Sequence, residues 1–372
     1  MVKIRKTSLL GGFSIASVCL LSLSTALPAQ VQHYTQTNLV ADTTGVAAAT
    51  DPNLVNPWGL SRSSGSPWWV SDNGPGLATL YSGAGAAASL VVTIPPAVSG
   101  SGQTGTPTGQ IFNGTTGFEL APGFPAKFIF VTEDGTVSGW NPGVSATAAV
   151  IKVNTKSASV FKGIAIATVD DPVKGSLNYL YVADFRKKHV NVYDTAFHRV
   201  TLWEEAFEDE RIPEDFAPFN IQNIGGNLYV AFAARDSARH DEIDGAGLGY
   251  VDVFSPTGRL LRRLEWGHWF NAPWGIAQAS SDFGVYSHDI LVGQFGSGQI
   301  LVFDPVTGKF KGKLLNAAGA PIAIDGLWGL AFGSGTGSGP ATSLYFTAGP
   351  GGEQHGLFGT ITAVENLLGG DQ

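Results

Sequence analysis

The sequence contains one cysteine in 372 residues, and that residue, Cys19, lies close to the amino terminus. A single cysteine cannot form an intramolecular disulfide, so the fold must be stabilised by packing and hydrogen bonds. Charged residues are also scarce, at 14% of the chain, and acidic residues outnumber basic ones to give a formal net charge of −8. An acidic protein has no electrostatic means of binding a phosphate backbone, which excludes nucleic acid as a partner.

Long apolar runs are absent after the first 29 residues, and residues 1–29 themselves predict a signal peptide. They begin with Lys3, Arg5 and Lys6, continue with an apolar stretch over 9–23, and end on small residues that suit cleavage before Gln30. The apolar stretch is shorter than the roughly 20 residues that a membrane span needs. We therefore expect an exported protein, periplasmic or extracellular, with no membrane span after the leader. Removing the leader takes three basic residues from 22, which leaves 19 against 30 acidic ones and a net charge of −11.

Glycine is abundant, with 49 residues, and it punctuates short apolar strands that recur along the chain. Six such strands align on the following residues: Val70, Val131, Val182, Val230, Val292 and Phe346. These anchors lie 48 to 62 residues apart. A repeat of about 50 residues made only of strands is typical of a β-propeller. The sequence therefore predicts an all-β fold over residues 30–372, a six-bladed β-propeller with four-stranded blades.

A short motif, which contains glycine in most blades, precedes most of these strands and is expected to form the first strand of each blade, which lines the central channel. Clear examples are Asn56–Leu60, Phe161–Ala165, Pro218–Ile221, Ala272–Ala277 and Gly326–Ala331. In blade two only a degraded version is visible, near Gly117–Leu120. The segment 95–109 before it is predicted to be a mobile surface loop, because it is rich in Ser, Gly, Thr and Pro.

The sixth blade has no outer strand in the C-terminal part of the sequence. We expect Tyr34–Val40 to pair with Leu357–Ile361 and to close the ring, since an N-terminal strand there would remove an exposed sheet edge. Two further segments depart from the repeat. One is an acidic run over 204–215, and the other is a charged insertion over 234–249, between the second and third strands of blade four.

Some repeats resemble a known group of propellers. Ala272–Ile276, Leu291–Val292 and Gln299–Asp304 form a pattern similar to an NHL repeat, and so do Tyr179–Asp184 and Val190–Asp194. The chain after the leader resembles an uncharacterised family of exported bacterial propeller proteins within the wider NHL and gluconolactonase/regucalcin-like group. The resemblance implies a six-bladed fold. It does not specify an activity, because propellers carry many unrelated functions.

Loops that enter the first strands share one face of a propeller with loops that join second to third strands. On that face the sequence places six carboxylate or amide side chains, from Asn56, Asp72, Glu133, Asp184, Asn271 and Asp325. Hard oxygen ligands of this kind suit Ca²⁺ or another divalent cation. The lactonases that the chain resembles hold such a cation at the channel mouth, where it polarises a carbonyl and activates water. The alternative is that these residues cap turns and strand ends.

An aromatic series occupies one repeat position in the first strands. It comprises Trp58, Phe219, Trp274 and Trp328, with Lys162 in blade three and Phe118 as a further candidate in blade two. These side chains either pack between neighbouring blades or form a collar that stacks a sugar or another ring at the mouth. With Arg235 from a second-to-third loop, the candidate ligand-binding residues are Trp58, Lys162, Arg235, Trp274 and Trp328.

Two histidines stand beside acidic residues. His240 precedes Asp241 and Glu242, and His355 follows Glu353, so each is a candidate acid–base pair or metal ligand, although solvent exposure without a role is the common alternative. We predict an exported binding or scaffold module that takes a small molecule, a glycan or a protein at the channel mouth. The alternative is a metal-dependent hydrolase or lyase of the lactonase type.

Overall fold

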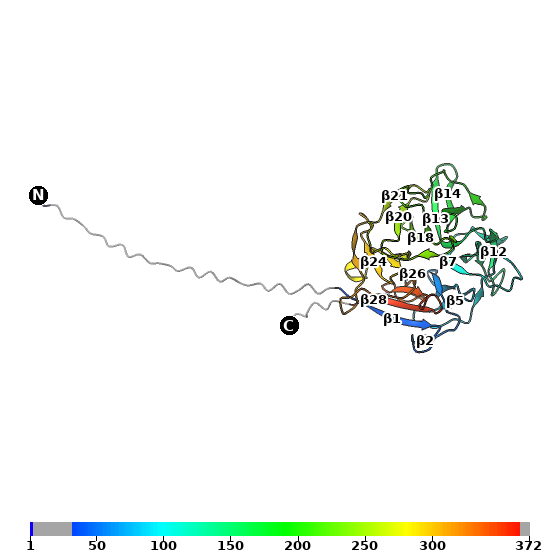
Figure 1. Cartoon of the computed structure of the whole chain (residues 1–372), viewed down its shortest axis with the longest axis horizontal. Helices are drawn as coiled ribbons and strands as arrows, with labels where there is room; N and C mark the ends of the chain where they lie inside the picture. Colours follow the sequence, from blue (N-terminus) through cyan, green and yellow to red (C-terminus); the bar gives the residue numbers. More distant parts are fainter. Residues whose placement is uncertain (3–31, 365–372) are drawn as a thin grey trace. The chain divides into compact units, whose positions relative to one another are not determined.

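The computed structural model describes residues 1–2 and 32–364, and residues 32–364 form a six-bladed β-propeller (Figure 1). The predicted signal peptide, residues 1–29, lies outside the described residues except for its first two. The described chain is nearly all strand, with one short 3₁₀ turn at Gly284–Tyr286. Nowhere in the described residues is a helix long and apolar enough to cross a bilayer.

Each of the first three blades is an antiparallel sheet of four strands, in sequence order from the channel outward. Blade one consists of β3 (Pro57–Ser61), β4 (Trp68–Asp72), β5 (Leu77–Tyr81) and β6 (Val92–Thr93). Blade two consists of β7 (Pro107–Phe112), β10 (Phe128–Thr132), β11 (Thr136–Trp140) and β12 (Val150–Asn154). Blade three consists of β13 (Phe161–Asp171), β14 (Gly175–Asp184), β15 (His189–Tyr193) and β16 (Arg199–Val200).

The remaining blades follow the same order, with additions in blades four and six. Blade four consists of β17 (Phe216–Ile224), β18 (Asn227–Arg235), β20 (Tyr250–Phe254) and β21 (Leu260–Arg263), and a short β19 (Glu242–Ile243) pairs with β18. Blade five consists of β22 (Pro273–Gln278), β23 (Ile290–Gln294), β24 (Ile300–Phe303) and β25 (Phe310–Lys313). Blade six consists of β26 (Leu327–Phe332), β27 (Leu344–Ala348), β28 (Leu357–Ala363), β1 (Tyr34–Ala41) and β2 (Ala49–Thr50).

Blade two differs from the prediction at its first strand. The inner strand is β7, which pairs with β10 and begins at Pro107, inside the segment that was expected to be a surface loop. The motif near Gly117–Leu120 instead leads into a small hairpin of β8 (Glu119–Ala121) and β9 (Phe124–Pro125). The expectation failed because β7 carries its channel glycine, Gly109, after Thr108, whereas four of the other five inner strands carry an aromatic residue at that position and blade three carries Lys162.

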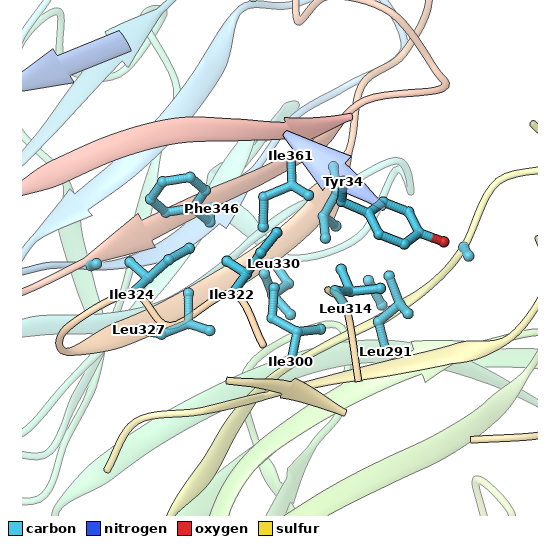
Figure 2. Close-up of a cluster of buried hydrophobic side chains, with 14 of the residues drawn as sticks. Tyr34, Leu291, Ile300, Leu314, Ile322, Ile324, Leu327, Leu330, Phe346 and Ile361 are labelled. Atoms are coloured by element: carbon cyan, nitrogen blue, oxygen red, sulfur yellow. The ribbon is translucent and has the colours of Figure 1, made fainter. Parts of the chain in front are cut away.

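The ring closes as predicted, through the N-terminal strand. β1 pairs antiparallel with β28 from Tyr34 opposite Ala363 to Ala41 opposite Leu357, and Figure 1 shows the two strands side by side. Tyr34 is buried, and its hydroxyl donates a hydrogen bond to the Phe283 carbonyl at 3.1 Å. Figure 2 shows its ring in the apolar cluster between blades five and six, near Ile361 and Leu314. The closing strand is therefore anchored by side-chain packing as well as by its backbone pairing.

Apolar side chains of the described chain gather in seven clusters. Six of them lie between neighbouring blades, one at each contact around the ring, and the seventh fills the channel. The inner strands approach one another so closely that glycine is required: a Cβ at Gly59 would collide with the Thr108 carbonyl, and one at Gly275 with the Trp328 carbonyl. Burial of one strand face against the next blade is the main stabilising contribution of such a fold.

Candidate functional site at the channel mouth

The channel is filled, just below the face where the inner strands begin, by a group of aromatic side chains. This aromatic plug consists of Trp58, Phe219, Trp274, Trp328, Phe185 and Phe295. The rings of Trp58 and Trp328 stack with centroids 3.4 Å apart, and Trp274 meets both edge-on at 5.8 Å. Trp58, Trp274 and Trp328 are only 1%, 4% and 0% exposed, so they pack rather than form an open collar.

The plug packs across the channel, whereas the sequence suggested packing between neighbouring blades. Trp58 from blade one contacts Phe219 from blade four at 6.3 Å, as well as Trp274 from blade five. Phe118 is buried elsewhere, against Phe197 at 5.5 Å, in the cluster between blades two and three. The blade two position in the inner ring belongs to Thr108, whose hydroxyl donates to the Phe161 carbonyl at 2.7 Å.

Lys162 occupies the blade three position of this ring and is fully buried. Its ammonium lies 4.7 Å from the centroid of Trp58 and within 6 Å of the rings of Phe185 and Phe219. Desolvated cation–π contacts of this kind stabilise by about 2 kcal/mol each. The same ammonium donates to Glu133 at 2.6 Å and lies 3.5 Å from Asp241.

The neighbouring carboxylates keep Lys162 protonated. Burial alone would lower the pKa of Lys162, but the negative charges of Glu133, Glu242 and Asp241 outweigh that effect and raise it above its ordinary value. The lysine is therefore a permanent cation inside the plug. It is a poor nucleophile in this state, because nucleophilic attack requires the neutral amine.

A chain of hydrogen bonds runs across the mouth above the plug. Glu133 accepts from the Asn73 amide at 2.8 Å, and Asn56 donates to Glu353 at 2.7 Å and to Asn73 at 3.4 Å. The Asn56 carbonyl oxygen accepts from the Trp328 indole at 3.1 Å. This chain joins blades one, two and six, and both of its carboxylates, those of Glu133 and Glu353, interact electrostatically with Lys162.

The insertion in blade four brings a second acidic group to the mouth. β19 pairs with the end of β18, and the His240 ring lies 2.7 Å from the Asp241 carboxylate. The hydrogen bond between them raises the pKa of His240 and lowers that of Asp241 to about 2. Burial raises the pKa of Glu242 to about 7, although Lys162 opposes the shift. Burial also raises the pKa of Glu353, against its hydrogen bond from Asn56.

Of the six predicted metal ligands, only Asn56 and Glu133 belong to this chain of hydrogen bonds. Asp72 accepts two hydrogen bonds from Thr79, at 2.7 and 3.1 Å, and is fully buried in blade one. Asp184 accepts from the Asn191 amide at 3.2 Å and from the Lys187 backbone at 3.1 Å. Both carboxylates thus cap the turn between the second and third strands of their own blades.

Asn271, Asp325 and Arg235 hold backbone segments around the mouth. Asn271 accepts from the Gly245 N–H at 2.6 Å, which fastens the blade four insertion, and the exposed Asp325 accepts from Gly351 at 2.9 Å. In the described chain the side-chain hydrogen bonds of Arg235 go to backbone carbonyls, including those of Arg186 and Glu214. His355 lies beside Asp42 at 2.9 Å, next to the strand that closes the ring.

Strand register explains why some residues face the mouth and others do not. Leu60 pairs with Val70 in blade one, and the corresponding Gln110 pairs with Phe130 in blade two, so Val70 and Phe130 occupy equivalent positions. Three residues further along each chain, Glu133 is therefore equivalent to Asn73 and not to Asp72. Phe185 and Phe295 occupy the same position in blades three and five, and both lie in the plug. Neighbouring residues at a strand end point to opposite sides, so a shift of one residue exchanges mouth-facing and turn-capping positions.

Three ligand atoms at the mouth lie close enough together to hold a metal ion. They belong to Glu133, His240 and Asp241, all within 4.8 Å of one another. Glu133 was among the six predicted carboxylate and amide ligands, and His240 with Asp241 was predicted separately as a candidate acid–base pair or metal ligand. With Asp241, the side chains of Glu242 and Glu353 complete the acidic mouth. The signal available in the sequence was the charged insertion over 234–249, which interrupts an otherwise apolar repeat.

Below the plug the channel opens toward the opposite face of the propeller. A cavity of about 510 Å³ there is lined by the ends of the inner strands, with Ile276 and Leu330 beside the amides of Gln110 and Gln222. Gln110 is nearly buried and donates to the carbonyls of Gly59 at 2.9 Å and Trp69 at 2.7 Å. The plug thus separates an acidic mouth from a channel that is lined by amides and by Arg62.

Relatives of the chain are found in a mimivirus. The uncharacterized protein R648 of Acanthamoeba polyphaga mimivirus is 33% identical over 302 residues, which are 79% of this chain and 72% of the relative. Protein L690 of the same virus is 32% identical over 302 residues, 79% of this chain and 77% of the relative. The chain belongs to the family of these proteins. No protein-family model matches it. The bacterial and exported character implied by the sequence resemblance stays a prediction.

Solved structures of other propeller-type proteins share the fold. A streptogramin B lyase superposes with a TM-score of 0.50 at 12% identity, over 90% of this chain and 98% of the lyase. A protein of unknown function from Bacteroides thetaiotaomicron superposes with a TM-score of 0.54 at 11% identity, over 90% of this chain and 77% of that protein. At such low identity the likeness concerns the fold alone.

Proposed function

We propose that this chain is an exported binding module that holds a positively charged group of its ligand at the channel mouth. The observation that carries the proposal is the imbalance of charge around Lys162. Four carboxylates, those of Glu133, Asp241, Glu242 and Glu353, act on this one buried ammonium. Even with His240 as a second basic group beside Asp241, the acidic side chains of the mouth outnumber the basic ones, and a cation from solution would offset that excess.

Two features of the mouth support binding at its rim. The raised pKa values of Glu242 and Glu353 show that ionising these partly buried carboxyls is costly, and a bound cation would reduce that cost. The aromatic plug lies directly beneath, so a ligand contacts the rim and does not pass into the channel. The matching ligand class is a small molecule or a protein side chain that carries an amine, or a divalent cation such as Ca²⁺.

Thermal unfolding tests this function. Millimolar Ca²⁺, Mg²⁺ or a polyamine such as spermidine should raise the melting temperature, because a ligand at one hundred times its dissociation constant stabilises by about 2.7 kcal/mol. The variant Glu353→Gln should respond less, and Glu205→Gln, an exposed site in the acidic loop over 204–215, should respond like the parent protein. An unchanged melting temperature with all three cations would overturn the proposal.

A metal-dependent hydrolase or lyase of the lactonase type is the second candidate function. The observation that favours it is the convergence of Glu133, His240 and Asp241 within 4.8 Å. Lys162 opposes it, because its ammonium already lies 2.6 Å from Glu133 and competes for that carboxylate.

The two candidate functions predict different effects of substituting His240. If the mouth is a catalytic metal centre, lactone hydrolysis should require an added divalent cation and should be lost in His240→Gln. Binding of spermidine, which needs only negative charge, should survive in that variant. Absence of lactone hydrolysis with Ca²⁺, Mg²⁺ and Zn²⁺ would remove the second candidate and leave the first intact.

A further inference from the structure

A second cavity, of about 760 Å³, lies between blades three and four and plays no part in the function proposed above. Its basic side chains come from the β14–β15 turn, from the end of β18 and from the loop after β18, and they include Arg186, Lys188 and Arg239. Its acidic side chains, among them Glu208 and Glu210, come from the loop between β16 and β17. This loop contains the acidic run over 204–215, which has no role in the function proposed for the mouth.

The charges of this cavity are nearly balanced. Five Lys or Arg side chains and four Asp or Glu side chains line it, and the two sets meet at the Lys188–Glu214 ion pair, with Nζ and Oε2 2.8 Å apart. A ligand of one charge would be attracted by one set and repelled by the other. A ligand with a positive and a negative end can satisfy both sets at once.

One basic group is fixed in place by backbone contacts. The Arg235 guanidinium donates to the carbonyls of Glu214 at 3.0 Å and Arg186 at 3.1 Å, so the protein holds it rigidly without a carboxylate partner within the described residues. Its positive charge therefore remains available to an anionic group. The neighbouring Arg239 is exposed and adds a second cationic group to the same side of the cavity lining.

The floor of the cavity is apolar. Phe207, Ile212 and Phe232 line it, and all three are buried. Phe207 is anchored edge-on against Tyr181 at 5.7 Å, and its backbone N–H donates to the Gly258 carbonyl at 2.9 Å. Specific small-ligand sites commonly combine such an apolar surface with a few fixed polar groups, in volumes of roughly 300–1,000 Å³.

We propose that this cavity binds a short peptide with free termini and an apolar side chain. The peptide carboxylate faces Arg235 and Arg239, its ammonium faces Glu208 and Glu210, and the apolar side chain rests on Phe207 and Phe232. An amino acid or peptide is the ligand chemistry that combines these three elements within one small molecule. The site is independent of the cation-binding mouth, because none of its charged residues belongs to the mouth carboxylates.

Calorimetric titration with matched dipeptides tests the proposal. The probes are Gly-Phe and Phe-Gly with free termini, their N-acetylated forms, which lack the ammonium, and their C-terminal amides, which lack the carboxylate. We expect a free dipeptide to bind, and each blocked form to bind about threefold to tenfold more weakly at low ionic strength. Equal binding of free and blocked forms, or no binding of either free dipeptide at millimolar concentration, would overturn the proposal.

Charge variants assign the two ends of the peptide. Glu208→Gln should weaken binding of the free dipeptide but not of its acetylated form, and Arg239→Gln should weaken binding of the free dipeptide but not of its amide. Lys309→Gln, at an exposed site in blade five, serves as the matched control, and unchanged melting temperatures establish that the variants fold. If Glu208→Gln and Arg239→Gln both bind the free dipeptide like the parent, the assigned orientation and the proposed site are wrong.

Discussion

The ammonium of Lys162 lies 4.7 Å from the centre of the Trp58 ring, and both side chains are buried beneath the channel mouth. A buried charge is tolerated only when it is paired, and here Glu133 at 2.6 Å provides the partner. The plug, the lysine and the acidic mouth therefore form one interdependent structure.

Removing the charge of Lys162 should destabilise the protein. Lys162→Met leaves Glu133 without its cation, and breaking a buried pair in this way costs about 3–5 kcal/mol. Adding Glu133→Gln should recover part of that loss, because the second change removes the uncompensated charge. Denaturant unfolding measures both. Additive losses in the double variant would show that the two groups do not interact.

The tryptophans of the plug should contribute more to stability than a tryptophan on the surface. Trp274→Ala should lower the free energy of unfolding by about 3–5 kcal/mol, because it leaves a cavity among packed rings. Trp266, which is 44% exposed, is the matched comparison, and Trp266→Ala should cost less. Equal losses would contradict the description of Trp274 as part of a close-packed plug.

The N-terminal strand should be necessary for a closed ring. A chain that begins after Asp42 lacks β1, which exposes the edge of β28 and removes Tyr34 from its cluster. We expect the melting temperature to fall by about 5 °C or more, and we expect association through the bared edge. Size-exclusion chromatography and calorimetry test this against a chain that begins at Gln32. A monomeric truncated protein of unchanged stability would argue against closure by β1.

Stability should depend on pH through Asp252 in blade four. Burial raises its pKa to about 6, although Arg263 at 2.9 Å opposes the shift. The folded state therefore binds more protons than the unfolded state between about pH 4 and 6, so the free energy of unfolding falls as the pH rises through that window. The loss is about 3 kcal/mol at most, at roughly 1.4 kcal/mol per pKa unit.

The variant Asp252→Asn should flatten this dependence, because it cannot ionise. Denaturant unfolding at pH values from 4 to 7 compares its slope with that of the parent protein. Asp325→Asn, at an exposed position, should keep the parent slope. Identical slopes for Asp252→Asn and the parent would contradict the raised pKa.

Most of the architecture could be predicted because it follows from local sequence patterns. In strands such as β15 and β20, successive side chains alternate between the two faces of the blade. The spacing of such strands along the sequence sets the number of blades. The inner strand of blade two was missed because β7 lacks the aromatic residue that four of its five counterparts carry. Its glycine, Gly109, was recognisable only from the neighbouring strand, since a Cβ there would meet the backbone of Gly163.

The sequence by itself determined the blade count, the second strands and the closing strand, because each depends on short-range alternation and on repeat length. Only the tertiary structure decided which carboxylates reach the mouth. Asp72 is the last residue of its second strand and Glu133 directly follows its own, yet Asp72 caps a turn with Thr79 while Glu133 binds Lys162 from the next blade. The physical reason is the strand register. A shift of one residue at a strand end turns the side chain to the opposite side, and the register is set by pairing between strands that lie far apart in the sequence.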